Sequence, residues 1–101
     1  MHEMSFSIKL TDYQKNAILN ICDANLLGKK ITEKELQVHI SQSYYGEKLV
    51  KKEEAKTLLK NSSIINMVGK EIVSLSTSLG IGSKDGIKEI DGVPFLIVYK
   101  M

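Results

Sequence analysis

The sequence contains no arginine and no tryptophan, and it has a single cysteine, Cys22, and a single proline, Pro94. One cysteine excludes an internal disulfide and fits a reducing compartment. With only Cys22, His2 and His39 as soft ligands, the chain has no zinc-binding spacing, so we predict no metal and no cofactor. The missing arginine removes the planar donor pair that grips phosphate or guanine bidentately, which disfavours specific reading of base edges.

Long apolar stretches are also missing. The longest apolar run, residues 95–99, has five residues, whereas a membrane helix needs about 20. Residues 1–5 show no basic region followed by an apolar stretch, so we expect no secretory signal, no membrane contact and a cytoplasmic location. With 101 residues, 43% of them hydrophobic and 26% charged, the chain is expected to form one globular domain, 1–101.

The net charge of +2 is too small to imply a polyanionic partner, but the charge is unevenly spread. All 14 basic residues are lysines, and residues 29–60 hold eight of them against five acidic residues. The positive excess therefore lies in the middle third of the chain.

Apolar and polar residues alternate with period two in three early segments, residues 5–11, 17–22 and 35–41. This alternation predicts half-buried strands, the first two joined as a hairpin by a turn over residues 12–16. Residues 24–31 read as irregular, with a bend at Gly28. The third strand is predicted to bury Leu36, Val38 and Ile40, and a loop is expected over residues 42–48.

The period changes to that of a helix after this loop. Residues 50–61 predict a short helix with Glu53 and Glu54 near its positive end and Lys60 near its negative end. A second helix is predicted to begin at a cap on Ser62 or Ser63 and to end before Gly80. Its apolar stripe follows helical spacing through Ile64, Ile65, Val68, Ile72, Leu75 and Leu79.

The C-terminal segment predicts a hairpin, with strands over residues 87–90 and from Val93 onward joined by a primed turn at Asp91-Gly92. Residues 95–99 are apolar enough to be buried on both faces. The predicted order is β-β-β-α-α-β-β. The fold class is α+β, a single domain whose mostly antiparallel sheet packs against two helices.

One candidate for catalysis combines Cys22 and Asp23 with His39, because the strands that carry them are predicted to be neighbours. A reactive thiolate requires a lowered pKa, and the sequence places no lysine or helix start beside Cys22. Cys22 is better interpreted as a small core residue and His39 as an outward-facing strand residue.

A candidate for nucleic-acid binding is the lysine-rich middle of the chain. Lys52, Lys56 and Lys60 recur every four residues and form one ridge of the predicted helix. Lysines beside tyrosines can hold a phosphodiester backbone and stack bases; glutamates nearby also allow an ordinary solvated face. The candidate binding residues are Lys29, Lys30, Tyr44, Tyr45, Lys48, Lys52, Lys56 and Lys60.

Four short motifs give the chain a resemblance to a family. They are Cys22-Asp23-x-x-Leu26-Leu27-Gly28-Lys29, Ser43-Tyr44-Tyr45-Gly46, Asn66-x-Val68-Gly69 and Gly92-Val93-Pro94. In this order they resemble an archaeal family of uncharacterised proteins, domain of unknown function 424. The resemblance implies an archaeal cytoplasmic α+β domain and supplies no activity. Similar sequences tend to carry histidine where this chain has Phe95.

Since the sequence shows no acid–base pair, nucleophile motif or metal-ligand set, we expect a protein that is not an enzyme. The favoured hypothesis is a small protein that binds RNA or a ribonucleoprotein through the lysine and tyrosine residues. One alternative is a protein-interaction module or small subunit of a larger complex. Another is a small enzyme that uses Cys22, Asp23 and His39.

Overall fold

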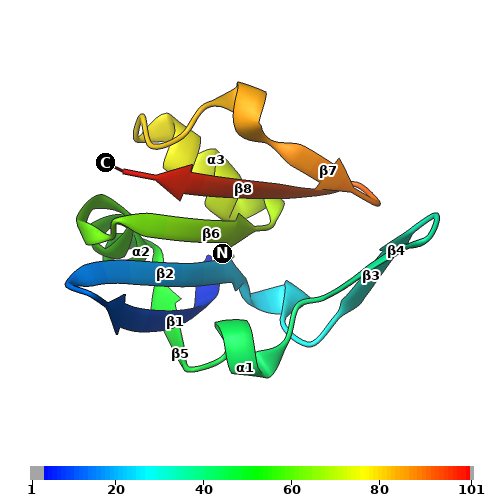
Figure 1. The fold of residues 1–101 in the computed structure, drawn as a ribbon, viewed down its shortest axis with the longest axis horizontal. Helices are drawn as coiled ribbons and strands as arrows, with labels where there is room; N and C mark the ends of the chain where they lie inside the picture. The colour runs from blue at the N-terminus through cyan, green and yellow to red at the C-terminus, as the bar shows by residue number, and fades with distance from the viewer. Residues whose placement is uncertain (1–3, 101) are drawn as a thin grey trace.

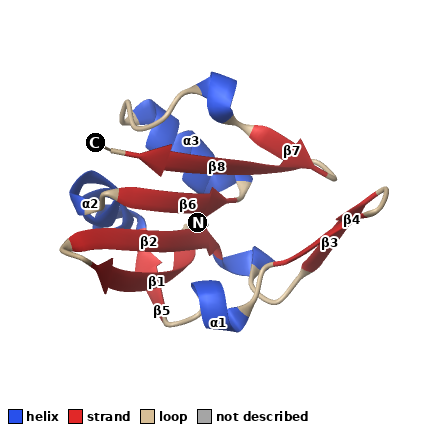
Figure 2. Cartoon of the chain, viewed as in Figure 1, coloured by secondary structure: helices blue, strands red, loops and turns tan. Residues whose placement is uncertain are grey.

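The strands follow a different order in space than in the sequence. In the computed structural model, which describes residues 4–100, a six-stranded sheet has the order β5-β1-β2-β6-β8-β7, and β3 and β4 form a separate pair. Neighbouring strands are antiparallel except β2 and β6, which are parallel (Figure 2). The strands are β1 (Ser5–Tyr13), β2 (Asn16–Asp23), β3 (Lys30–Glu33), β4 (Leu36–His39), β5 (Lys48–Lys51), β6 (Ile64–Val68), β7 (Lys88–Ile90) and β8 (Val93–Tyr99), and the helices are α1 (Gln42–Tyr45), α2 (Lys52–Asn61) and α3 (Lys70–Ser78).

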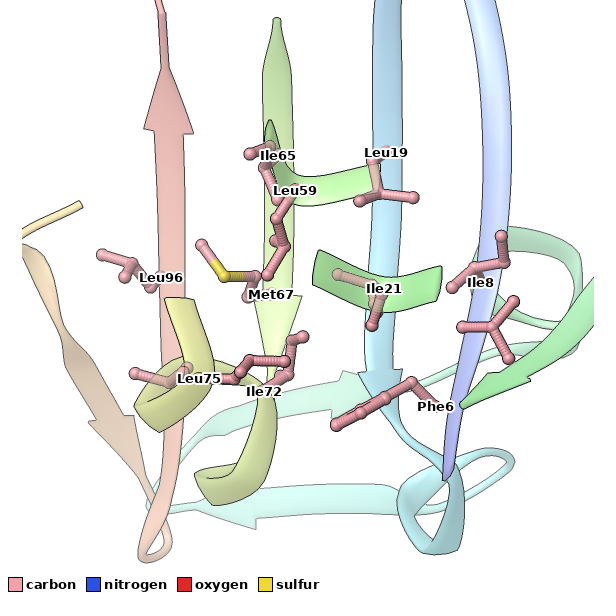
Figure 3. Packing of buried hydrophobic residues seen from close by; sticks show 13 residues of the cluster. Phe6, Ile8, Leu19, Ile21, Leu59, Ile65, Met67, Ile72, Leu75 and Leu96 are labelled. Carbon is pink, nitrogen blue, oxygen red and sulfur yellow. The ribbon is translucent and has the colours of Figure 1, made fainter. Parts of the chain in front are cut away.

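The main core lies between one face of the six-stranded sheet and the helices α2 and α3, which lie behind the strands in Figure 1. Alternate residues of each strand point into it because successive side chains of a strand face opposite sides. Figure 3 shows this packing, with strand residues meeting residues of the two helices. The fully buried residues of the main core include Phe6, Leu19, Ile21, Ala55, Leu59, Ile65 and Ile72.

A second, smaller core lies on the opposite face of the same sheet. We call the pair β3–β4 the arm; it lies over one end of this face, beside α1 (Figure 1). The arm contributes Ile31, and the segment after it contributes Ile40, to a cluster with three residues of the sheet. The sheet residues are Cys22, Val68 and Ile90.

Both predicted hairpins are confirmed. The β1–β2 turn is tighter than predicted, with Gln14 and Lys15 at φ 51° and 68°, and the β7–β8 turn has Asp91 and Gly92 at φ 50° and 77°. Positive φ at both central residues is the signature of the primed turns that suit a twisted hairpin. Of the described residues, 4–100, no helix is long and apolar enough to cross a membrane.

The predicted helix over residues 62–79 is wrong in its first half. Ile64–Val68 is the strand β6 at the centre of the sheet, and only Lys70–Ser78 is helical. Three of the five β6 residues are β-branched, and strand pairing on both sides satisfies their backbone. Gly69, with φ 124°, separates the two elements, while Gly80, with φ 78°, ends the helix as predicted. The helical spacing of the apolar residues arose from joining a strand to a helix.

The middle of the chain also differs from prediction. Strand β3 begins at the end of the segment predicted to be irregular, and α1 lies in the predicted loop. Strand β5 covers the end of that loop and the start of the predicted helix, so α2 begins at Lys52. Leu36 in β4 is 45% exposed. Each strand of the arm pairs only with the other strand, and the arm buries little surface next to its turn, where Leu36 lies. Residues 95–99 are not buried on both faces: Ile97 is 55% and Tyr99 65% exposed. The α+β class and the mostly antiparallel sheet are confirmed, with a third helix and three further strands.

Candidate nucleic-acid interface

The sheet divides the eight residues predicted to bind nucleic acid into two groups. The first group lies on the helix side and consists of Lys48 in β5 and three lysines of α2, Lys52, Lys56 and Lys60. Two of these lysines are paired: Lys48 Nζ lies 2.8 Å from Glu54 Oε2, and Lys56 Nζ lies 3.3 Å from Glu53 Oε2. This first group therefore carries less uncompensated charge than its lysine count indicates.

The second group lies on the other side of the sheet. Lys29 and Lys30 are exposed at the base of the arm, and Tyr44 in α1 is 65% exposed. Tyr45 is half-buried against the second core, and this burial raises the pKa of its hydroxyl. The structure thus does not bring the eight residues together on one surface, and only Tyr44 of the two tyrosines has an exposed ring.

The proposed catalytic trio has the wrong environment for a thiolate–imidazole pair. Cys22 is fully buried, and burial raises the pKa of its thiol to about 12. The thiol is therefore protonated at neutral pH, the opposite of what nucleophilic cysteine chemistry requires. His39 lies exposed in β4 opposite Lys30, as its outward-facing position in the sequence indicated.

Asp23, at the carboxyl end of β2, binds the first turn of α3. Its Oδ2 accepts the Glu71 N–H at 3.0 Å and its Oδ1 accepts the Ile72 N–H at 2.8 Å, so the carboxylate caps α3. Burial raises the pKa of Asp23, and the two N–H donors offset part of that rise. Gly69 lies directly against this carboxyl group, where a Cβ atom would collide with it.

A small pocket of ≈ 230 Å³ opens beside this cap. The residues that line it include Asp23, Lys70, Glu71, Gly92 and Pro94. The two oxygens of Asp23 are already bonded to the helix, so this carboxylate acts as a helix cap. Among residues 4–100 no group of three histidine, cysteine or acidic residues is placed to hold a metal ion.

A different surface, which the sequence did not reveal, lies on the sheet face away from α2 and α3. Beyond the arm, two rows of side chains cross the strands β1, β2, β6 and β8 on this face. We call these eight residues the open face, which is turned toward the viewer in Figure 1. The rows are Thr11, Ile18, Ile64 and Tyr99, and Lys9, Asn20, Asn66 and Ile97.

The open face combines exposed apolar and aromatic groups with two amides. Tyr99 and Ile97 are mostly exposed, whereas Ile18 and Ile64 are half-buried. At its centre Asn66 Nδ2 donates to Asn20 Oδ1 at 2.7 Å, across the parallel strands. Lys9 is the one charged residue among the eight positions, and none is acidic.

Part of this surface had a signal in the sequence. The alternation of residues 17–22 places Ile18 and Asn20 on one face of a strand. The partner residues Ile64 and Asn66 were hidden because β6 reads as the start of a helix. Ile97 and Tyr99 were hidden because a continuous apolar run predicts burial on both faces.

The segments that carry the family resemblance meet at one end of the sheet. Asp23 contacts Gly69 and caps α3, and the Gly69 N–H donates to the Pro94 carbonyl oxygen at 2.9 Å. Cys22, Val68 and half-buried residues of the other two motifs share the second core. Phe95, where similar sequences tend to carry histidine, packs against the same cluster.

Comparison with known proteins agrees with this fold. A crystal structure of an uncharacterised conserved protein from Methanopyrus kandleri is similar, with a TM-score of 0.77 and 23% identity over 96% of this chain and 94% of that chain. No curated protein matches the chain. The family model described as "Protein of unknown function (DUF424)" matches residues 11–101, so the chain belongs to that family.

Proposed function

We propose that this protein binds single-stranded RNA, alone or in a ribonucleoprotein, on the open face. The observation that carries the proposal is the composition of that face. Exposed Tyr99 and Ile97 lie on β8, on one side of a hydrogen-bonded amide pair, and the only charge among the eight positions, that of Lys9, lies on the other side. A surface that carries stacking groups and a cation, without carboxylates among its positions, suits unpaired bases joined by phosphates.

The dimensions of the face fit a short stretch of single strand. Neighbouring strands lie about 4.8 Å apart, so the row from Lys9 on β1 to Ile97 on β8 spans about 14 Å. Four-stranded sheets that recognise RNA stack about two or three bases on such a surface. Tyr99 offers the stacking ring at the β8 side of the face.

The β1 side of the face is where positive charge and a second exposed ring come together. Lys9 Nζ donates to the Ser43 carbonyl oxygen at 2.9 Å, which places α1 and the exposed Tyr44 beside this lysine. Lys29 and Lys30 lie on the same side of the sheet, at the base of the arm. Lysines without arginine contact phosphates, which position a strand without specifying its sequence.

A protein partner is the second candidate for the same surface. Ile18, Ile64 and Ile97 are neighbours across three strands, and Ile97 is 55% exposed. Exposed apolar side chains in a continuous patch are typical of protein interfaces. This alternative predicts binding that is insensitive to Lys9 and to salt.

The test is fluorescence anisotropy with a labelled single-stranded RNA of mixed sequence, about eight nucleotides long, at low salt. Tyr99→Ala should weaken binding about 5- to 150-fold, since a base stacked on an aromatic ring contributes about 1–3 kcal/mol. Lys9→Gln should reduce the slope of log affinity against log salt by about 0.7, the value for one phosphate contact of a single strand.

Two control variants test where the site lies. Tyr13 is 62% exposed and follows Thr11 on the same face of β1, but it lies at the tip of the β1–β2 hairpin, where β6 does not pair, so Tyr13→Ala should weaken binding less than Tyr99→Ala does. The triple change Lys52→Gln, Lys56→Gln and Lys60→Gln tests the helix side. Loss of binding in the triple variant, with unchanged binding by Tyr99→Ala and Lys9→Gln, would place the site on α2. No binding at up to about 100 μM protein, the weak end of non-specific affinities, would refute the proposal.

A further inference from the structure

The two amides at the centre of the open face are arranged as a unit. Asn20 and Asn66 are in register on the parallel strands β2 and β6, and a 2.7 Å hydrogen bond joins Asn66 Nδ2 to Asn20 Oδ1. Both side chains are half-buried. Their neighbours in the row are Lys9 on one side and Ile97 on the other.

The bond between the amides leaves most of their hydrogen-bonding capacity for a ligand. An asparagine side chain carries two N–H donors and an oxygen with two lone pairs, and the bond uses one donor of Asn66 and one lone pair of Asn20. In a planar amide the oxygen lies beside one N–H, and the bond leaves free the oxygen and one N–H of Asn66, and both N–H groups and one lone pair of Asn20. A group with an acceptor beside a donor binds a partner that offers a donor beside an acceptor.

The Watson–Crick edge of an unpaired base is such a partner. Each base carries a donor next to an acceptor on that edge, and in a duplex the opposite base occupies both. We propose that the Asn20–Asn66 pair is the base-reading element of the open face and binds the Watson–Crick edge of one unpaired base. The inference rests on the proposed function, and it adds selectivity for bases that are free of a partner strand.

The geometry around the pair supports this role. Tyr99 lies in the adjacent row on β8 and is the diagonal neighbour of Asn66, so a base stacked on the Tyr99 ring lies within reach of the amide pair. The mutual hydrogen bond already holds the two amides in place. Binding therefore loses less side-chain freedom than it would with two free asparagines.

The experiment compares two oligouridines of equal length, one natural and one methylated at N3 of every base. The methyl group blocks the Watson–Crick edge and leaves the charge and the stacking faces in place. The natural protein should bind the methylated RNA about 5- to 150-fold more weakly, the range for one bidentate contact to a base edge. Anisotropy titrations at one salt concentration give both affinities.

The matched variant is the double change Asn20→Leu and Asn66→Leu, which replaces both partners by apolar groups of similar shape and so leaves no unpaired amide. It should bind both RNAs with the affinity that the natural protein has for the methylated one. A thermal melt by circular dichroism checks its folding, and Asn66→Ser serves as a smaller change if the double variant is unfolded.

The outcomes separate the two proposals. Equal binding of both oligouridines by the natural protein would overturn the base-reading role and leave RNA binding standing. Discrimination that persists in the folded double variant would overturn it too, as would binding of the mixed-sequence RNA without binding of oligouridine. Failure to bind any of the RNAs would refute the proposed function itself.

Discussion

Two regions of one sheet face have opposite environments although the same strands form them. Under the arm, Cys22 of β2 and Val68 of β6 pair in register and are 0% and 1% exposed. Two residues earlier on each strand, Asn20 and Asn66 pair in the same way, but they are half-buried and carry amides. The difference shows that the cover supplied by the arm and α1, and not position within the sheet, decides which residues belong to the core.

The largest effect should follow from placing a charge in the covered region. Val68→Asp buries a carboxylate without a partner, which should cost enough to unfold a domain whose total stability is of the order of 5–15 kcal/mol. The matched change two residues away, Asn66→Asp, should cost only about 1 kcal/mol, the value of one hydrogen bond. Urea unfolding of both variants makes the comparison; similar costs would show that the two regions are equally buried.

A smaller but substantial effect is expected at Gly69, which joins the covered region to α3. Gly69→Ala forces an alanine into φ 124°, which should cost about 1–3 kcal/mol, and sets its Cβ against the Asp23 carboxyl group, which should add to that loss. Gly80→Ala is the control, because Gly80 also has positive φ, 78°, but open space around it. Chemical denaturation should give Gly80→Ala a loss of about 1 kcal/mol; equal losses would mean that the contact with Asp23 is unimportant.

Removing the cap itself should cost less. Asp23→Ala deletes both acceptors of the Glu71 and Ile72 N–H groups, and a lost helix cap is worth about 0.5–2 kcal/mol. Hydrogen exchange should show faster exchange in the first turn of α3 and little change in the β1–β2 hairpin. Uniform acceleration across the chain would indicate a global role for Asp23.

The smallest effect concerns pH. Because burial raises the pKa of Asp23 in the folded protein, the proton is bound more tightly there than in the unfolded chain. The stability that this tighter proton binding adds is complete below about pH 3.9, the ordinary pKa of aspartate, and is lost as the pH rises through the pKa of Asp23 in the folded protein. The unfolding free energy of the natural protein relative to Asp23→Asn should therefore fall as the pH rises above about 4. A relative stability that rises over this range would contradict the direction.

Local sequence signals predicted the parts of this fold that local contacts build. Asp91-Gly92 between two apolar runs predicted the β7–β8 hairpin, and the alternation before and after residue 14 predicted β1–β2. The β6 strand was missed because Ile64, Ile65 and Val68 have helical spacing with Ile72 of α3, and only pairing with β2 and β8 makes the segment extended. The periodicity of a segment also does not show whether distant segments cover it, which is why Tyr99 and Leu36 were predicted to be buried.

For the same reason the sequence did not predict the open face. It is assembled from four strands, and its central amides, Asn20 and Asn66, lie 46 residues apart. The sequence did place Cys22 in the core and His39 in an outward-facing position. It also showed the lysines of α2, but not that Glu53 and Glu54 pair with two of the basic residues on that side.

The parallel pairing of β2 with β6 also has a consequence for the folding kinetics. Both hairpins close through tight turns, whereas pairing of β6 with β2 closes a long connection that includes the arm, α1, β5 and α2. Closing so long a loop costs chain entropy before the new contacts stabilise it. We expect the hairpins to form first and the β2–β6 pairing to limit the folding rate. The open face, whose two halves come from either side of that pairing, then exists only once the slowest step is complete.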